Sequence, residues 1–115
     1  MRLQDALALI EAVSAEALGH LPREALLFIV DGMTADEYAS FIFAKNKKVF
    51  GGINPYIDDF FEKGTVDRIL AMPAGPGRES SVIGARDLLQ RMMNQDGISE
   101  DNRRRVTAAL DQLRG

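Results

Sequence analysis

The chain has 115 residues, 46% of them apolar and 27% charged, a composition that excludes a disordered chain. Its formal net charge of −3 argues against nucleic-acid binding. It contains no cysteine, which excludes disulfides and thiolate metal sites and fits a reducing compartment. Its longest apolar run, from Ala25 to Val30, is too short to cross a bilayer, and Met1 opens no secretory signal, so we expect one cytoplasmic domain over residues 1–115.

The first third of the chain predicts two helices. Apolar residues from Leu3 to Leu18 recur every three or four positions, which indicates an amphipathic helix over residues 3–18 that Gly19 ends. Pro22 suits the first turn of a second helix. The apolar run over residues 25–30, Phe28 included, is expected to be buried, either as a short central helix or as a strand, because periodicity alone does not separate the two.

A capping box begins the next element. In the segment Thr34-Ala35-Asp36-Glu37, the threonine hydroxyl can accept from the Glu37 N–H while the glutamate carboxylate accepts from the Thr34 N–H. This pattern predicts a helix from residue 34 to about residue 50, where two glycines end it. The alternative is a minor β-hairpin over residues 41–50 around Asn46-Lys47, a turn that lacks the favoured glycine.

The rest of the chain predicts four more short helices. They are one capped by Asn54 and ended by Gly64, one that begins at Thr65, one over residues 80–93 and one over residues 99–114. A loop rich in proline and glycine over residues 72–78 separates the second from the third. Phe60 lies at the centre of an apolar stripe and is expected to be buried. The fold class is therefore expected to be all-α, a compact single-domain bundle of about six or seven short helices.

No combination of residues predicts a catalytic, metal or cofactor site. His20, the single histidine, follows a glycine that ends a helix and is expected to be solvated. Asp58 and Asp59 point about 100° apart on the polar side of a helix, which is a poor geometry for joint ligation. The segment Gly75-Pro76-Gly77 lacks the third glycine of a dinucleotide fingerprint and the lysine of a phosphate loop. We therefore expect a non-enzymatic protein with no cofactor, no metal and no small-molecule substrate.

Charge and aromatic residues are unevenly distributed along the chain. Residues 1–44 contain seven acidic and two basic residues, a balance of −5, whereas residues 45–115 have a balance of +2. All eight aromatic residues fall between Phe28 and Phe61, and every lysine falls between Lys45 and Lys63. Most of these rings must be core, but an exposed ring beside lysines is typical of a protein interface.

Phe43, Lys47 and Lys48 are the residues that we expect on such an interface. On a helix over residues 34–50, Phe43 and Lys47 lie one turn apart on the same side. Lysine is nearly always solvated, so Phe43 borders water unless another segment covers it, and packing beneath the proline and glycine loop is the alternative. The expected function is an adaptor, inhibitor or regulatory subunit whose partner is another protein or a second copy of the chain.

Arg103, Arg104 and Arg105 provide the alternative function, a nucleic-acid-associated regulator. They lie in the second turn of the last helix, which forms a helical hairpin with the helix over residues 80–93. Glu100 and Asp101, at the end that would enter a DNA groove, would repel phosphate. A purely structural hairpin is therefore favoured over nucleic-acid binding.

Overall fold

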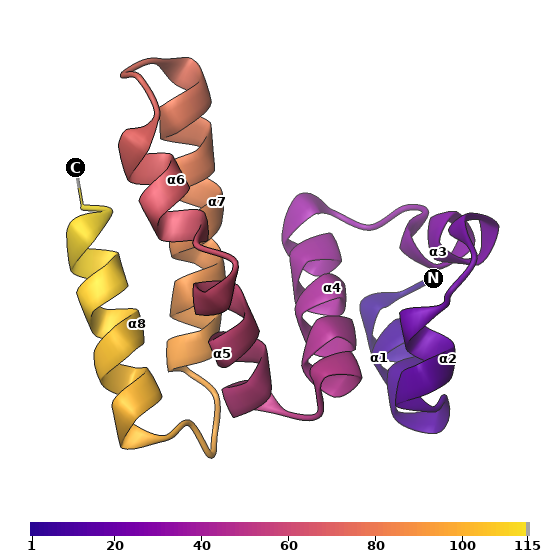
Figure 1. The fold of residues 1–115 in the computed structure, drawn as a ribbon. Coiled ribbons are helices and arrows are strands. Elements are labelled where there is room, and N and C mark those ends of the chain that lie inside the picture. Colours follow the sequence, from indigo (N-terminus) through magenta and orange to yellow (C-terminus); the bar gives the residue numbers. More distant parts are fainter. Residues whose placement is uncertain (115) are drawn as a thin grey trace. The chain divides into compact units, whose positions relative to one another are not determined.

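A computed structural model describes residues 1–114, and every regular element in that range is an α-helix, so the all-α prediction is confirmed (Figure 1). The helices are α1 (Leu3–Ala12), α2 (Ala15–Gly19), α3 (Arg23–Val30), α4 (Ala35–Phe50), α5 (Ile53–Glu62), α6 (Thr65–Ala71), α7 (Pro76–Met93) and α8 (Glu100–Gln112). The chain divides into two compact units, of which the first ends at Gly52 and the second begins at Ile53. The expectation of one domain over residues 1–115 stays a prediction.

The core of the first unit is formed by all four of its helices. Its buried members are Ala6, Ile10, Leu18, Ile29 and Phe41. Helices α1 and α2 both pack against α4, whose Phe41 ring is fully buried. The core therefore forms around one face of the longest helix of the unit.

The helix expected over residues 3–18 is two helices. Its continuity breaks at Ser14, which has an extended backbone (φ −64°, ψ 155°) and whose hydroxyl accepts from the Ala17 N–H at 3.1 Å. A serine side chain competes in this way with the helical hydrogen bonds of the backbone, and it caps α2 instead.

The Lys48 ammonium of α4 donates to the carbonyls of Ile10 (2.7 Å), Glu11 (3.1 Å) and Val13 at the end of α1. These bonds satisfy carbonyls that the end of a helix leaves without partners.

The apolar run over residues 25–30 is helical, so its alternative as a strand is wrong. The expectation that Phe28 is buried is also wrong, because the ring is 70% exposed and Leu27 beside it is 54% exposed. Successive residues of a helix point about 100° apart, so an uninterrupted apolar run covers every side of it. The first unit packs only the side with Ile29 into its core and leaves the opposite side in water.

The capping box of α4 is present as expected. The Glu37 N–H donates to the Thr34 hydroxyl at 3.1 Å, and the Thr34 N–H donates to the Glu37 carboxylate at 3.0 Å. The helix continues to Phe50, so the alternative of a hairpin over residues 41–50 is wrong. Gly51 ends it in the left-handed conformation (φ 90°), which glycine adopts without a steric penalty.

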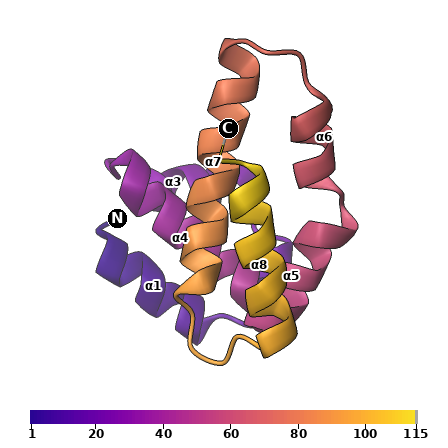
Figure 2. The same ribbon diagram turned by 90° about the vertical axis from the view of Figure 1, so that its left-hand side faces the viewer.

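The second unit contains α5 to α8. Helices α7 and α8 lie side by side and run in opposite directions, with α6 packed on α7 (Figures 1 and 2). Phe60 is 7% exposed, as expected from its apolar stripe. The most deeply buried large side chains of this unit are Ile57, Leu89, Met92, Val106 and Leu113.

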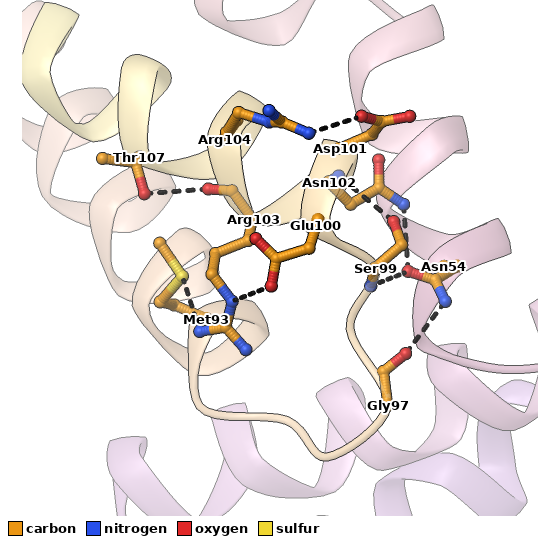
Figure 3. Close-up of polar contacts among 10 residues, drawn as sticks. All are labelled: Asn54, Met93, Gly97, Ser99, Glu100, Asp101, Asn102, Arg103, Arg104 and Thr107. Atoms are coloured by element: carbon orange, nitrogen blue, oxygen red, sulfur yellow. Dashed lines mark hydrogen bonds and ion pairs between the residues drawn. The ribbon is translucent and has the colours of Figure 1, made fainter.

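Two helices of the second unit start earlier than the sequence predicts. Helix α5 begins at Ile53, so the side chain of Asn54 does not cap it and instead contacts Gly97, Ser99 and Asn102 (Figure 3). Helix α7 begins at Pro76 rather than near residue 80. Proline is well tolerated at the first helical position because its missing N–H would have no helical partner there.

Candidate partner-binding surfaces

Phe43, the centre of the interface expected from the sequence, does not border water. Its side chain is only 7% exposed. Phe41, Ile42 and Phe43 together span about 200° of the circumference of α4. Phe41 and Phe43 are buried and Ile42 is partly buried, so cover extends over more than half of the circumference. The sequence could not predict this, because helical spacing identifies which residues share a side but not which sides are covered.

Lys47 and Lys48 are both half-buried on the last turns of α4. The ammonium of Lys48 is held by the carbonyls at the end of α1, so it stabilises the first unit. The structure therefore leaves these lysines without the exposed ring expected beside them. A partner-binding role for Phe43, Lys47 and Lys48 stays a prediction.

The most exposed aromatic ring among residues 1–114 is Phe28, on α3. Glu24, Leu27, Phe28 and Asp31 follow the spacing i, i+3, i+4 and i+7, so they share one side of the helix, and all four are exposed. We call these four residues the α3 face. It presents two large apolar side chains between two carboxylates that lie about 10 Å apart along the helix axis.

The other side and the end of helix α3 contact the rest of the first unit. On its opposite side, Leu26, Ile29 and Val30 pack in the core of the first unit. The amino group of Met1 donates to the carbonyls of Ile29 at 2.9 Å and Asp31 at 3.3 Å, at the end of α3. The α3 face was missed from the sequence although its spacing was visible, because the apolar run was interpreted as buried on all sides.

Arg103 and Arg104 each have an acidic neighbour three residues earlier on α8. The Arg103 Nε lies 3.9 Å from the Glu100 carboxylate, and the Arg104 Nη2 lies 3.0 Å from that of Asp101 (Figure 3). Both arginines are exposed, so these pairs contribute little to stability. They do reduce the positive potential that phosphate would encounter.

Arg105 is used differently from its two neighbours. Its Nη1 lies 2.9 Å from the Asp58 carboxylate and 2.9 Å from Oδ1 of Asn102. Its guanidinium also lies 4.6 Å from the centre of the Phe61 ring, a cation–π contact. Arg103, Arg104 and Arg105 are thus not brought together as an unpaired cationic patch.

The remaining polar candidates of the sequence form no common site. His20 is exposed at the end of α2. Asp58 pairs with Arg105, whereas Asp59 pairs with Lys63 at 2.8 Å, so the adjacent carboxylates have separate partners. Among the described residues, no group of three or more histidine or acidic side chains could hold a metal ion. No helix within residues 1–114 is both long enough and apolar enough to cross a membrane.

Comparisons with protein-family models, with curated proteins and with solved structures found no match to this chain. Its function is therefore inferred from its own side chains.

Proposed function

We propose that the protein is a non-enzymatic protein–protein interaction module that binds a partner protein through the α3 face. The observation that carries the proposal is the 70% exposure of Phe28 next to the 54% exposure of Leu27. Exposed apolar patches of this kind mark interaction sites, and aromatic side chains dominate interface energies. Full burial of each side chain by a partner would contribute roughly 1.5–3 kcal/mol.

The charges of the α3 face define the chemistry of that partner. Glu24 and Asp31 lie at the two ends of the face, and neither forms an ion pair with any residue of the described chain. A partner with an apolar pocket rimmed by lysine or arginine would cover the two apolar side chains and meet both carboxylates. Complementary charges of this kind speed association and exclude wrong partners.

The same charges favour a foreign partner over a symmetric dimer. In a twofold dimer formed by two α3 faces, each face would meet an identical one. Four carboxylates would then surround the buried rings, and their repulsion would oppose association. The proposed role is therefore that of an adaptor, inhibitor or regulatory subunit. We place it in the cytoplasm, because a chain without cysteine forms no disulfides and so does not require an oxidising compartment.

The nucleic-acid alternative has no comparable support. Arg103, Arg104 and Arg105 would have to neutralise phosphates, and each already has a carboxylate within 4 Å.

Capture of binding proteins from native lysate by the full chain tests the proposal. We expect a protein retained by the wild-type chain to be lost with Phe28→Ser and with Glu24→Lys/Asp31→Lys. Tyr38→Ser is the control, because Tyr38 is also an exposed aromatic residue, at 44%, but lies on α4 and outside both the α3 face and the second unit. Equal retention by wild type and Phe28→Ser would contradict the proposal, and so would the failure of the wild-type chain to retain any protein.

A further inference from the structure

A groove of about 500 Å³ opens on the second unit, between the end of α6, the first half of α7 and the last turn of α8. The N-terminal turns of α7 extend past the end of α8, which leaves them without its cover (Figures 1 and 2). We call this region the α7 groove, and the residues that matter here are Leu70, Arg78, Val82, Ile83, Arg86 and Arg114.

The α7 groove has an apolar part that is open to water. Ile83 is 70% exposed and Leu70 is 37% exposed, with the half-buried Val82 next to Ile83. Glu79, Val82, Ile83 and Arg86 follow the spacing i, i+3, i+4 and i+7, so they form one side of α7. A ridge of this kind is the surface against which a second helix packs.

The charged residues that line the groove are mainly basic, with Arg78, Arg86 and Arg114 against the single acid Glu79. Arg86 Nη1 donates to the carbonyl of Leu110 at 2.8 Å, and Arg78 Nε donates to that of Ile69 at 3.4 Å. Each guanidinium has five N–H donors, so these bonds orient the groups and leave other donors for a ligand.

Arg78 and Arg86 have no carboxylate within 4 Å in residues 1–114, unlike Arg114, which lies 3.3 Å from Asp111. Two oriented cations without a counter-ion in the described part of the chain therefore flank an exposed apolar ridge. They are eight residues apart on α7, which corresponds to about 12 Å along the axis.

We propose that the α7 groove binds a short acidic amphipathic helix of a partner protein. Two carboxylates seven residues apart on such a helix are separated by about 10 Å, which is close to the axial spacing of about 12 Å between Arg78 and Arg86. Large apolar side chains between the carboxylates would cover Leu70 and Ile83. Arginine binds carboxylates through paired hydrogen bonds, which fixes the register of the docked helix.

Other ligands fit the α7 groove less well. Small-molecule sites enclose most of their ligand, whereas the apolar side chains here, Leu70 and Ile83, are exposed. Nucleic acid would meet an apolar ridge and the Glu79 carboxylate in place of a continuous basic track. The inference goes beyond the proposed function, since it rests on another unit and on a surface whose charge is opposite to that of the α3 face.

The test is a titration of the full chain with a synthetic helix, a lactam-bridged peptide in which glutamates at i and i+7 flank leucine at i+3 and phenylalanine at i+4. We expect binding that weakens about tenfold or more with Arg78→Glu/Arg86→Glu and with Ile83→Ser. A peptide with lysine in place of both glutamates should not bind the wild type and should bind the Arg78→Glu/Arg86→Glu variant. Phe28→Ser should bind the acidic peptide like the wild type, which separates this inference from the proposed function.

Replacing Arg86 removes its bond to the carbonyl of Leu110, so a second variant guards against a folding defect. Glu79→Lys adds a positive charge at an exposed position and should tighten binding severalfold. The inference is overturned if the acidic peptide does not bind, if Glu79→Lys leaves its affinity unchanged, or if both peptides bind equally. It is also overturned if the groove variants abolish self-association of the full chain in sedimentation, or if single-stranded DNA binds there more tightly than the peptide.

Discussion

The side-chain amide of Asn102 donates to Oδ1 of Asn54 at 3.0 Å, although the two residues are 48 positions apart. The same oxygen accepts from the Ser99 N–H at 2.9 Å, and the Asn54 amide donates to the Gly97 carbonyl at 3.0 Å (Figure 3). Asn102 is 4% exposed, so its amide depends on this contact for a hydrogen-bond partner. One asparagine thus connects the start of α5 to the loop before α8 and to the first turn of α8.

Asn54→Ala should therefore destabilise the protein by about 1–3 kcal/mol, because it leaves the buried Asn102 amide without its acceptor. The free energy of unfolding in urea is the measurement. Gln90→Ala, at an exposed position of α7, should change it by less than about 0.5 kcal/mol. Equal stability of the two variants would show that water replaces these bonds without loss.

Lys48→Met should lower the free energy of unfolding by roughly 1–3 kcal/mol, because three carbonyls at the end of α1 lose a charged donor. Lys63→Met is the comparison, since it removes an ion pair with 61% of the lysine side chain exposed. Such a pair contributes less than about 1 kcal/mol. A Lys48→Met variant as stable as the wild type would contradict the stabilising role of these bonds and would leave Lys48 free for the partner-binding role that the sequence predicts.

Phe41→Ala and Phe28→Ala should differ sharply in thermal denaturation. Phe41 is fully buried in the first core, so its loss should cost about 3–5 kcal/mol. Phe28 is 70% exposed, and its replacement should change stability by less than about 0.5 kcal/mol. A large loss with Phe28→Ala would mean that the ring is core, and the α3 face would then not be available to a partner.

Helix starts and stops could be predicted where a local signal specifies them. The Thr34–Glu37 capping box and Gly51 define the start and the end of α4 through bonds between near neighbours, so both ends can be recognised in the sequence. The break at Ser14 was missed, because a serine between two apolar turns is compatible with either a continued helix or a new cap.

Exposure could not be predicted in the same way. An apolar run such as residues 25–30 indicates which residues could be buried, but the neighbouring helices decide which side is covered. The exposed Phe28 is an error of this kind, and the burial of Phe43 is the alternative that the sequence left open. The pairing of Arg103 with Glu100 can be predicted from their i, i+3 spacing. The α7 groove cannot be predicted in this way, because residues from three helices form it.

Charge should control the rate at which a partner reaches the α3 face. Glu24→Lys/Asp31→Lys should slow association with the captured partner more than it speeds dissociation, and added salt should reduce the difference. Biolayer interferometry at low and high salt measures both rates. Asp101→Lys/Asp111→Lys, at two exposed positions of α8, changes the net charge by the same amount and should leave both rates close to those of wild type. If the α3 variant changes only the dissociation rate, the partner has no basic rim.

The most direct measurement is site-specific photo-crosslinking of the full chain in native lysate. Benzoylphenylalanine replaces Phe28 on the α3 face in one variant and Lys47, on the surface expected from the sequence, in another. We expect a discrete cross-linked partner from position 28, lost when Leu27→Ser is added, and none from position 47. A partner cross-linked from position 47 and not from position 28 would contradict the assignment of the α3 face.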